Sequence, residues 1–295
     1  MIIVDGQIHL WEKGTPSAHH RQEPYSAEQA IADMDDAGID RALVHPVLWD
    51  PDSNELAQAA VRKYPDRFAI MGWFYLDDPQ GRDIVAHWKE RPGMVGLRFY
   101  TNDRHPQSWF TDGALEWLWP AAERAGVPVS LGAAMFLPTV GRIAERHPGL
   151  KLIVDHMGVP RASKGEAAYG FQPELLALAK HPNIAVKATG QAGYAEDEYP
   201  FRSLHPHLHR CFDAFGLGHR HHPHALHLAA MRDVVHRGTA VAEGARSRSR
   251  NGRGAVQLGR LAAPGRRQKL RGWVVGIRCR GWLIESCRNT IGEPF

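Results

Sequence analysis

The sequence has few cysteines and no long apolar stretch. Only three cysteines occur in 295 residues, at Cys211, Cys279 and Cys287. Their odd number and wide spacing exclude a disulfide-built scaffold and are typical of the reducing cytosol. No run of about 18 or more apolar residues occurs, so we expect neither a membrane-spanning helix nor a membrane partner. The first residues lack a basic segment ahead of an apolar one, which predicts no secretory signal and a cytoplasmic location.

Charge is divided sharply along the chain. The net charge is +4 over 295 residues. Residues 1–216 hold 21 Lys and Arg against 28 Asp and Glu, whereas residues 217–295 hold 15 against 4. The sequence therefore predicts an acidic domain over residues 1–216 and a basic Arg/His-rich tail over residues 217–295 that is poorly ordered.

Short apolar runs alternate with amphipathic segments throughout residues 1–216. The expected strands lie in residues 2–10, 41–47, 68–74, 94–100, 127–133, 150–157 and 184–189. The expected helices follow them at residues 26–37, 54–63, 81–90, 114–125, 137–147, 174–180 and 204–215. This alternation predicts a parallel sheet with both faces covered. Seven such units are one short of a (β/α)₈ TIM barrel, whose eighth unit should begin just after Gly216.

Polar side chains interrupt the ends of these expected strands. Asp5, Gln7 and His9 alternate with other residues in the first strand, so their side chains point to one face. In a TIM barrel the carboxyl ends of all strands meet at one mouth, which holds the active site. We therefore expect Asp5, Gln7 and His9 to face this mouth.

Later strands bring a guanidinium, a carboxylate, an imidazole and an ammonium group to the same mouth. These groups belong to Arg98, Asp155, His156 and Lys187. Structural interpretations remain open: Arg98 in an ion pair, Asp155 orienting a loop, and Lys187 extending past the core to solvent. His45 is more simply explained as a hydrogen-bonded structural histidine. The predicted convergence favours a site made by His9, His156, Arg98, Gln7 and Asp5, with Asp155 and Lys187 in secondary roles.

The same segments resemble a known family. Residues 3–11, Ile-Val-Asp-Gly-Gln-Ile-His-Leu-Trp, resemble the opening D-x-H-x-H motif of the amidohydrolase-related (amidohydrolase 2) family of TIM barrels. Residues 96–99 and 152–158 resemble segments of its fourth and sixth strands, and residues 200–207 and 212–216 resemble a subgroup. The family includes metal-dependent hydrolases, decarboxylases and pyrone-dicarboxylate lactonases. The resemblance thus implies a metal-dependent-hydrolase-like TIM barrel over residues 1–216.

Two departures from the family pattern bear on a metal cofactor. Gln7 stands where the first histidine of the His-x-His pair is usual, and an amide is a poor ligand for Zn²⁺. The family's eighth-strand aspartate, which binds metal or acts as general base in a motif like G-[ST]-D, does not occur in this sequence. One divalent metal, such as Zn²⁺, on His9 and His156 is the cofactor that the resemblance suggests, and these two departures argue against tight binding.

The basic tail has three interpretations. Its arginines are typical of a nucleic-acid-binding segment, and the six histidines within residues 219–236 are typical of a metal-binding tract. The third interpretation is a reading-frame shift. The eighth strand expected from the family would read F-W-G-T-D-I-T-R-M-P-C-T-W. GC-rich codons can be chosen for this strand so that translation from their third base gives residues 217–228 of this chain. We therefore expect a small deletion after the Gly216 codon that carries translation past the usual stop, and no nucleic-acid partner.

These observations predict a hydrolase for a small carboxylated cyclic ester or amide, of lactonase or amidohydrolase type. Arg98 would pair with the substrate carboxylate, and His9 with His156 would polarise the scissile carbonyl. Gln7 would orient His9 or the substrate. A metal-dependent decarboxylase on the same scaffold and a non-enzymatic protein with a basic nucleic-acid-binding tail are the alternatives. Loss of the eighth strand would leave edges unpaired, from which we expect low solubility and little or no hydrolase activity.

Overall fold

The computed structural model describes residues 3–16, 20–101, 105–160 and 163–215. The expectations for the eighth unit and the basic tail, with Cys279 and Cys287, lie outside these residues. No helix in the described part of the chain is both long and apolar enough to cross a membrane.

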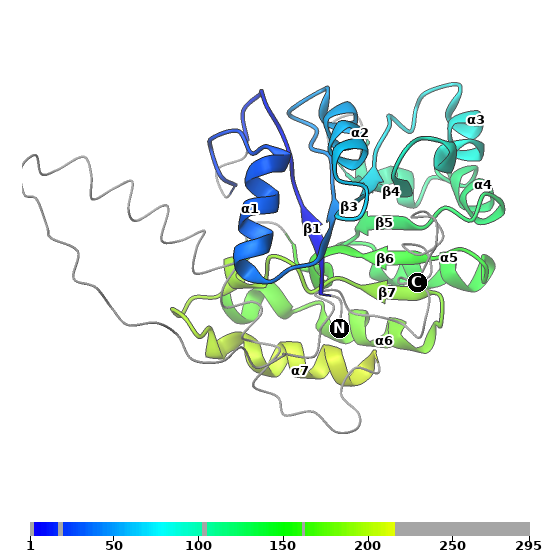
Figure 1. Cartoon of the computed structure of the whole chain (residues 1–295). Helices are drawn as coiled ribbons and strands as arrows, with labels where there is room; N and C mark the ends of the chain where they lie inside the picture. Colours follow the sequence, from blue (N-terminus) through cyan, green and yellow to red (C-terminus); the bar gives the residue numbers. More distant parts are fainter. Residues whose placement is uncertain (1–2, 17–19, 102–104, 161–162, 216–295) are drawn as a thin grey trace, which may run out of the picture.

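Seven parallel strands form one sheet in chain order, and the sheet curls as part of a barrel (Figure 1). The strands are β1 (Val4–Ile8), β2 (Arg41–Val44), β3 (Phe68–Gly72), β4 (Met94–Tyr100), β5 (Val129–Gly132), β6 (Leu152–Val154) and β7 (Ile184–Val186). Every neighbouring pair is parallel. The predicted α/β barrel architecture is confirmed. β4 spans its whole apolar run, whereas the other six strands are shorter than theirs.

A helix follows each strand, and the helices lie around the outside of the curled sheet (Figure 1). They are α1 (Ala27–Ala37), α2 (Ser53–Lys63), α3 (Gly81–Ala86), α4 (Leu118–Arg124), α5 (Leu137–Arg146), α6 (Gln172–Ala177) and α7 (His205–Ala214). The start of α1 shows how the sequence sets these boundaries. Ser26 accepts a hydrogen bond from the Gln29 N–H while the Gln29 side chain accepts one from the Ser26 N–H. This capping box satisfies donors that a helix start leaves unpaired.

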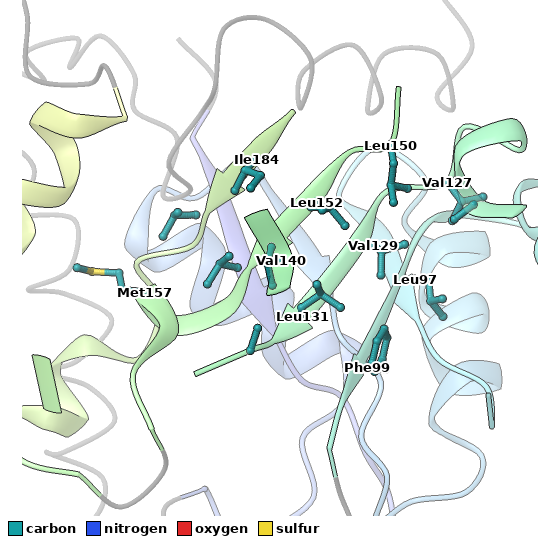
Figure 2. Packing of buried hydrophobic residues seen from close by; sticks show 14 of the residues in the cluster. Leu97, Phe99, Val127, Val129, Leu131, Val140, Leu150, Leu152, Met157 and Ile184 are labelled. Atoms are coloured by element: carbon teal, nitrogen blue, oxygen red, sulfur yellow. The ribbon is translucent and has the colours of Figure 1, made fainter. Parts of the chain in front are cut away.

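The main core lies between the outer face of the sheet and the helices. Figure 2 shows part of it, with labelled side chains Leu97, Phe99, Val127, Val129, Leu131, Val140, Leu150, Leu152, Met157 and Ile184. Most of these side chains come from β4 to β7, and α5 contributes Val140 to the same cluster. Burial of this apolar surface is the main term that stabilises the layered arrangement.

The sheet has two edges among the described residues. β1 pairs with β2 and β7 pairs with β6, while β1 and β7 do not pair with each other. A barrel closes only when its first and last strands are bridged. The described strands therefore form seven-eighths of a TIM barrel.

Candidate active site

Side-chain alternation places the polar site directly above a small inner core. Inside the curled sheet, one apolar cluster contains Leu43, Ala69, Met71, Val95, Ile153 and Ala185. Two residues beyond Leu43, Ile153 and Ala185, the next inward-facing residues after β2, β6 and β7 are polar. They are His45, Asp155 and Lys187. Successive side chains of a strand point to opposite faces, so these residues lie above the apolar cluster. The inner face changes from apolar to polar at the carboxyl ends of the strands.

Asp155 is the centre of this polar layer. Its Oδ1 accepts hydrogen bonds from Ser130 Oγ at 2.5 Å and from Lys187 Nζ at 2.6 Å, and its Oδ2 accepts one from Arg98 Nε at 2.7 Å. Burial alone would raise the pKa of Asp155, but Lys187 and then Arg98 outweigh it and hold this pKa well below its ordinary value. Asp155 is therefore an anion that holds two cations. The ion pair that the sequence analysis gave as one interpretation of Arg98 is present, with Asp155 as the partner.

Lys187 is enclosed by three partners. Its Nζ lies 2.6 Å from Asp155 Oδ1, 2.9 Å from Gln7 Oε1 and 3.3 Å from His45 Nε2. The side chain is 7% exposed, so the interpretation that it extends to solvent is wrong. Burial lowers the pKa of Lys187 to about 8, and Asp155 opposes this decrease. The Asp155 and Gln7 oxygens thus accept two of the ammonium hydrogens, and the His45 ring lies beside the ammonium group.

Gln7 lies between the ammonium of Lys187 and two imidazoles. Its Oε1 accepts from Lys187 Nζ, which fixes the orientation of the carboxamide. Its Nε2 then lies 3.4 Å from His9 Nε2 and 3.4 Å from His156 Nε2. A carboxamide NH₂ group carries two hydrogens and donates in both directions. Gln7 therefore links β1 to the two imidazoles and to β7.

The tautomer of each imidazole follows from the hydrogen-bond partners of its Nδ1 atom. His9 Nδ1 lies 2.6 Å from the His45 carbonyl oxygen, and His156 Nδ1 lies 3.1 Å from the Thr189 carbonyl oxygen. His156 Nδ1 also lies 3.0 Å from Thr189 Oγ1, a hydroxyl that can accept or donate. Because a carbonyl oxygen only accepts, we assign the hydrogen to Nδ1 of each ring and the lone pair to Nε2, with the Thr189 hydroxyl oxygen as a second acceptor at His156. Burial, followed by the charge of Arg98, lowers the pKa of His9 to about 3.

His156 is likewise neutral. Burial lowers its pKa to about 4, although the negative charge of Asp155 opposes this effect. Both neutral imidazoles therefore accept hydrogen bonds at Nε2 and do not donate them. This geometry corrects the expectation that His9 and His156 polarise a carbonyl, because polarising an oxygen requires a hydrogen-bond donor.

Asp5 and His45 lie beneath this group. Asp5 Oδ1 accepts a hydrogen bond from the Gln7 backbone N–H at 2.9 Å. Burial raises the pKa of Asp5 to about 6, and the Gln7 hydrogen bond and Lys187 limit the increase. His45 Nε2 lies 3.2 Å from the Gly6 carbonyl oxygen, and its buried Nδ1 has no hydrogen-bond partner among the described residues. Asp5 thus supports the Gln7 backbone, and His45 is the hydrogen-bonded histidine expected from the sequence.

A bulge in β4 directs Arg98 into the site. Ile70 pairs with Met94 but Met71 pairs with Gly96, so Val95 is an extra residue on β4. Bulges of this kind re-aim the side chains that follow them. A pocket beside Arg98 is lined by Pro46, Leu48, Trp73, Phe74, Phe99, Tyr100 and His105. Asp155 holds the guanidinium through Nε, and Arg98 lines a largely aromatic pocket.

The metal suggested by the family resemblance does not fit this donor set. Among the described residues, no three His, Cys, Asp or Glu side chains form a group that could hold a metal ion. The two Nε2 lone pairs are directed at the Gln7 amide nitrogen, whose hydrogens repel a cation. Catalytic zinc sites use three protein ligands, which exceeds the two imidazoles available. Gln7 thus occupies the space between His9 and His156.

The structure brings every predicted site residue to one region and adds three that the sequence reasoning missed. These are Ser130 on Asp155, Thr189 on His156, and Gln191, whose Nε2 donates to the His156 and Thr189 carbonyls. Ser130 is the one polar residue of its apolar run, a signal that could have identified it. Thr189 and Gln191 act through a loop whose path the sequence pattern does not define.

The fold and the site together define a class: a TIM-barrel-type protein with a polar site at the carboxyl ends of its strands. The model of the family described as Amidohydrolase matches residues 4–219. This match covers most of the chain, and the protein belongs to the amidohydrolase family. The resemblance noted in the sequence is confirmed.

A curated relative is L-fucono-1,5-lactonase of Burkholderia ambifaria, 25% identical over 224 residues that cover 72% of this chain and 76% of the relative. Solved structures with the same fold include a zinc-bound amidohydrolase from Burkholderia multivorans, with a TM-score of 0.61, 19% identity and coverage of 73% and 81%. A putative 2-pyrone-4,6-dicarboxylic acid hydrolase from Pseudomonas putida has a TM-score of 0.56, 18% identity and coverage of 73% and 79%. The structural similarities establish the common fold.

Proposed function

We propose that this site hydrolyses a small carboxylated cyclic ester, with a cyclic amide as the related substrate. The observation that carries the proposal is the position of Arg98. Arg98 lines the aromatic pocket, and its charge acts on both His9 and His156. A fixed cation beside two proton acceptors suits an anionic substrate that is attacked by water.

Arg98 binds the substrate carboxylate in this proposal. Its Nε is held by Asp155 at 2.7 Å, which fixes the plane of the guanidinium. A planar guanidinium pairs with a carboxylate through two parallel hydrogen bonds, an arrangement that gives both affinity and orientation. The Tyr100 ring, whose centroid lies 5.4 Å from Arg98 Cζ, provides an aromatic surface beside this pair.

The neutral imidazoles act on water. The Nε2 lone pairs of His9 and His156 face the Gln7 amide in this structure. In this proposal the attacking water molecule replaces the Gln7 amide at these lone pairs, which orient the water and accept its proton. Negative charge that develops on the scissile carbonyl oxygen is stabilised by the field of Arg98 and Lys187. Bases with pKa values of about 3 and about 4 are weak at neutral pH. The expected hydrolysis is therefore slow.

Two comparisons support this substrate class. The Burkholderia ambifaria relative is named a lactonase, and the Pseudomonas putida structure is named as a hydrolase of a dicarboxylic acid. A ring ester and a carboxylate are the two features for which the site offers proton acceptors and a guanidinium.

Rates of acid release from a carboxylated lactone and from its methyl ester test the proposal. We expect the full chain to favour the carboxylated substrate, and Arg98→Met to raise its KM at least about tenfold, the effect of losing roughly 1.4 kcal/mol of charge-assisted binding. Arg142→Met is the control, because Arg142 is exposed and bonds only Thr139 Oγ1 in the described contacts. Equal rates for the two substrates, or equal effects of the two variants, would overturn the proposal.

The two alternatives have distinct outcomes in the same experiments. Release of CO₂ from an aromatic carboxylate together with stoichiometric metal would identify a decarboxylase. Binding of DNA or RNA with a steep salt dependence, lost on removing residues 217–295, would identify the basic-tailed binding protein.

A further inference from the structure

The backbone at His156 has a conformation that its own sequence does not favour. His156 and Met157 have φ angles of 53° and 56°, and both are in the left-handed region. Side chains other than glycine rarely adopt this region, and two in succession need support from their surroundings. This turn, within the 3-10 segment Asp155–Gly158, directs the His156 ring toward Gln7.

The loop after β7 supplies that support through one buried side chain. Gln191 is 0% exposed. Its Nε2 donates to the His156 carbonyl oxygen at 3.2 Å and to the Thr189 carbonyl oxygen at 3.2 Å, and its Oε1 accepts from Tyr169 Oη at 2.9 Å. The three contacts agree on one orientation of the carboxamide. Gln191 therefore connects the backbone of His156 to Tyr169 through a fully buried group.

The Thr189 carbonyl has two donors directed at it. His156 Nδ1 lies 3.1 Å from this oxygen, and Gln191 Nε2 lies 3.2 Å from it. This carbonyl oxygen only accepts, so it favours the hydrogen on Nδ1 of His156, and Thr189 Oγ1 lies 3.0 Å from the same Nδ1. Gln191 thus fixes both the backbone of His156 and the carbonyl acceptor for its ring N–H.

We propose that Gln191 is a positioning residue that holds His156 in the turn and tautomer that direct its Nε2 lone pair into the site. This role depends on both N–H groups of the carboxamide, and Tyr169 keeps that carboxamide from rotating. His9 Nδ1 donates to the His45 carbonyl oxygen rather than to a group held by Gln191. The effect is therefore specific to one of the two imidazoles.

The test is the tautomer of His156, measured from the ring ¹⁵N shifts of the full chain labelled at histidine. Signals of His156 are identified by their loss in His156→Asn. In Gln191→Glu we expect the ratio of the Nδ1–H form to the Nε2–H form of His156 to fall about tenfold, the effect of losing a buried hydrogen bond. The ratio for His9 stays unchanged. Tyr169→Phe, which removes only the hydroxyl on Gln191, gives a smaller change in the same direction.

Gln172→Glu is the matched control. Gln172 is also a buried glutamine, and its Nε2 donates to the His207 carbonyl at 2.7 Å rather than to the His156 turn. We expect this variant to leave the His156 tautomer as in the wild type. An unchanged tautomer in Gln191→Glu, or an equal change in Gln172→Glu, would overturn the proposal.

Kinetics give a second readout that rests on the proposed function. Gln191→Glu should lower kcat for the carboxylated lactone with less than about a twofold change in KM, because the carboxylate is bound by Arg98. If neither the wild-type chain nor the chain with its frame restored after Gly216 hydrolyses a lactone, the proposed function fails, while the tautomer measurement still decides the role of Gln191. A lower kcat with an unchanged tautomer would contradict that role.

Discussion

His9 and His156 direct their Nε2 atoms at the same partner, Gln7 Nε2, each at 3.4 Å. Both imidazoles donate through Nδ1 to backbone carbonyls, so the lone pairs converge. Two converging lone pairs usually surround a metal ion or a proton donor. In this protein a carboxamide, held from its other end by Lys187 Nζ at 2.9 Å, takes that place.

Replacing Gln7 by His should create a zinc site. The variant adds a third imidazole to the two converging ones and removes the amide hydrogens that face them, and three protein ligands suffice for zinc. We expect zinc near one equivalent in purified Gln7→His and well below one in the wild-type chain, measured by elemental analysis after dialysis.

The control for this gain is Gln58→His, which adds an imidazole on α2 away from the site. It should bind no more zinc than the wild type. Stoichiometric zinc in the wild-type chain that is lost in His9→Ala would contradict the interpretation of Gln7.

Removing the Lys187 ammonium should destabilise the fold strongly. Lys187→Met leaves Asp155 buried with one cation fewer and Gln7 Oε1 without its donor. Removing one partner of a buried ion pair costs about 3 kcal/mol or more. The free energy of unfolding in urea measures the loss.

Lys180→Met is the comparison for this variant. Lys180 lies 3.2 Å from Glu145 with 68% of its side chain exposed, and exposed pairs contribute little. Its substitution should change the free energy of unfolding by less than about 0.5 kcal/mol. Similar losses in the two variants would show that Lys187 is not a buried anchor.

Acid should destabilise the protein partly through His156. Its pKa is about 4 in the folded chain against an ordinary value of 6.5, so between these pH values the unfolded chain binds a proton that the folded chain does not. The free energy of unfolding therefore falls as the pH decreases through this window. His156→Asn should reduce the slope there by up to about 1.4 kcal/mol per pH unit.

Unfolding in urea at several pH values between 4 and 6.5 measures this slope, with the exposed His209→Asn as control. The control should retain the wild-type slope. A slope in His156→Asn equal to that of the wild type would mean that the folded chain protonates His156 as readily as the unfolded chain does.

The sequence predicted the strand and helix order because alternation of apolar runs is a local signal, and it predicted the site because carboxyl ends of parallel strands converge. It did not predict the direction of hydrogen bonds. Whether an imidazole donates or accepts at Nε2 depends on distant carbonyls such as those of His45 and Thr189. The left-handed turn at His156 and its support by Gln191 likewise arise from loop packing rather than from periodicity.

The frameshift hypothesis concerns residues 217–295, and sequencing the DNA across the Gly216 codon tests it. We expect another reading frame after this codon to encode a G-T-D-containing strand followed by a helix. Restoring that frame should raise solubility and hydrolase activity, because an eighth strand would bridge β1 and β7. No such coding sequence in any frame would show that the basic segment has another origin.

Hydrolysis of a carboxylated lactone by chelator-treated, zinc-free protein tests the central claim most directly. We expect slow hydrolysis that persists without metal and is not increased by added zinc, and we expect Arg98→Met to weaken substrate binding. Hydrolysis that stops on chelation and returns with zinc would contradict it, because the His9 and His156 lone pairs would then serve a metal rather than face the Gln7 amide.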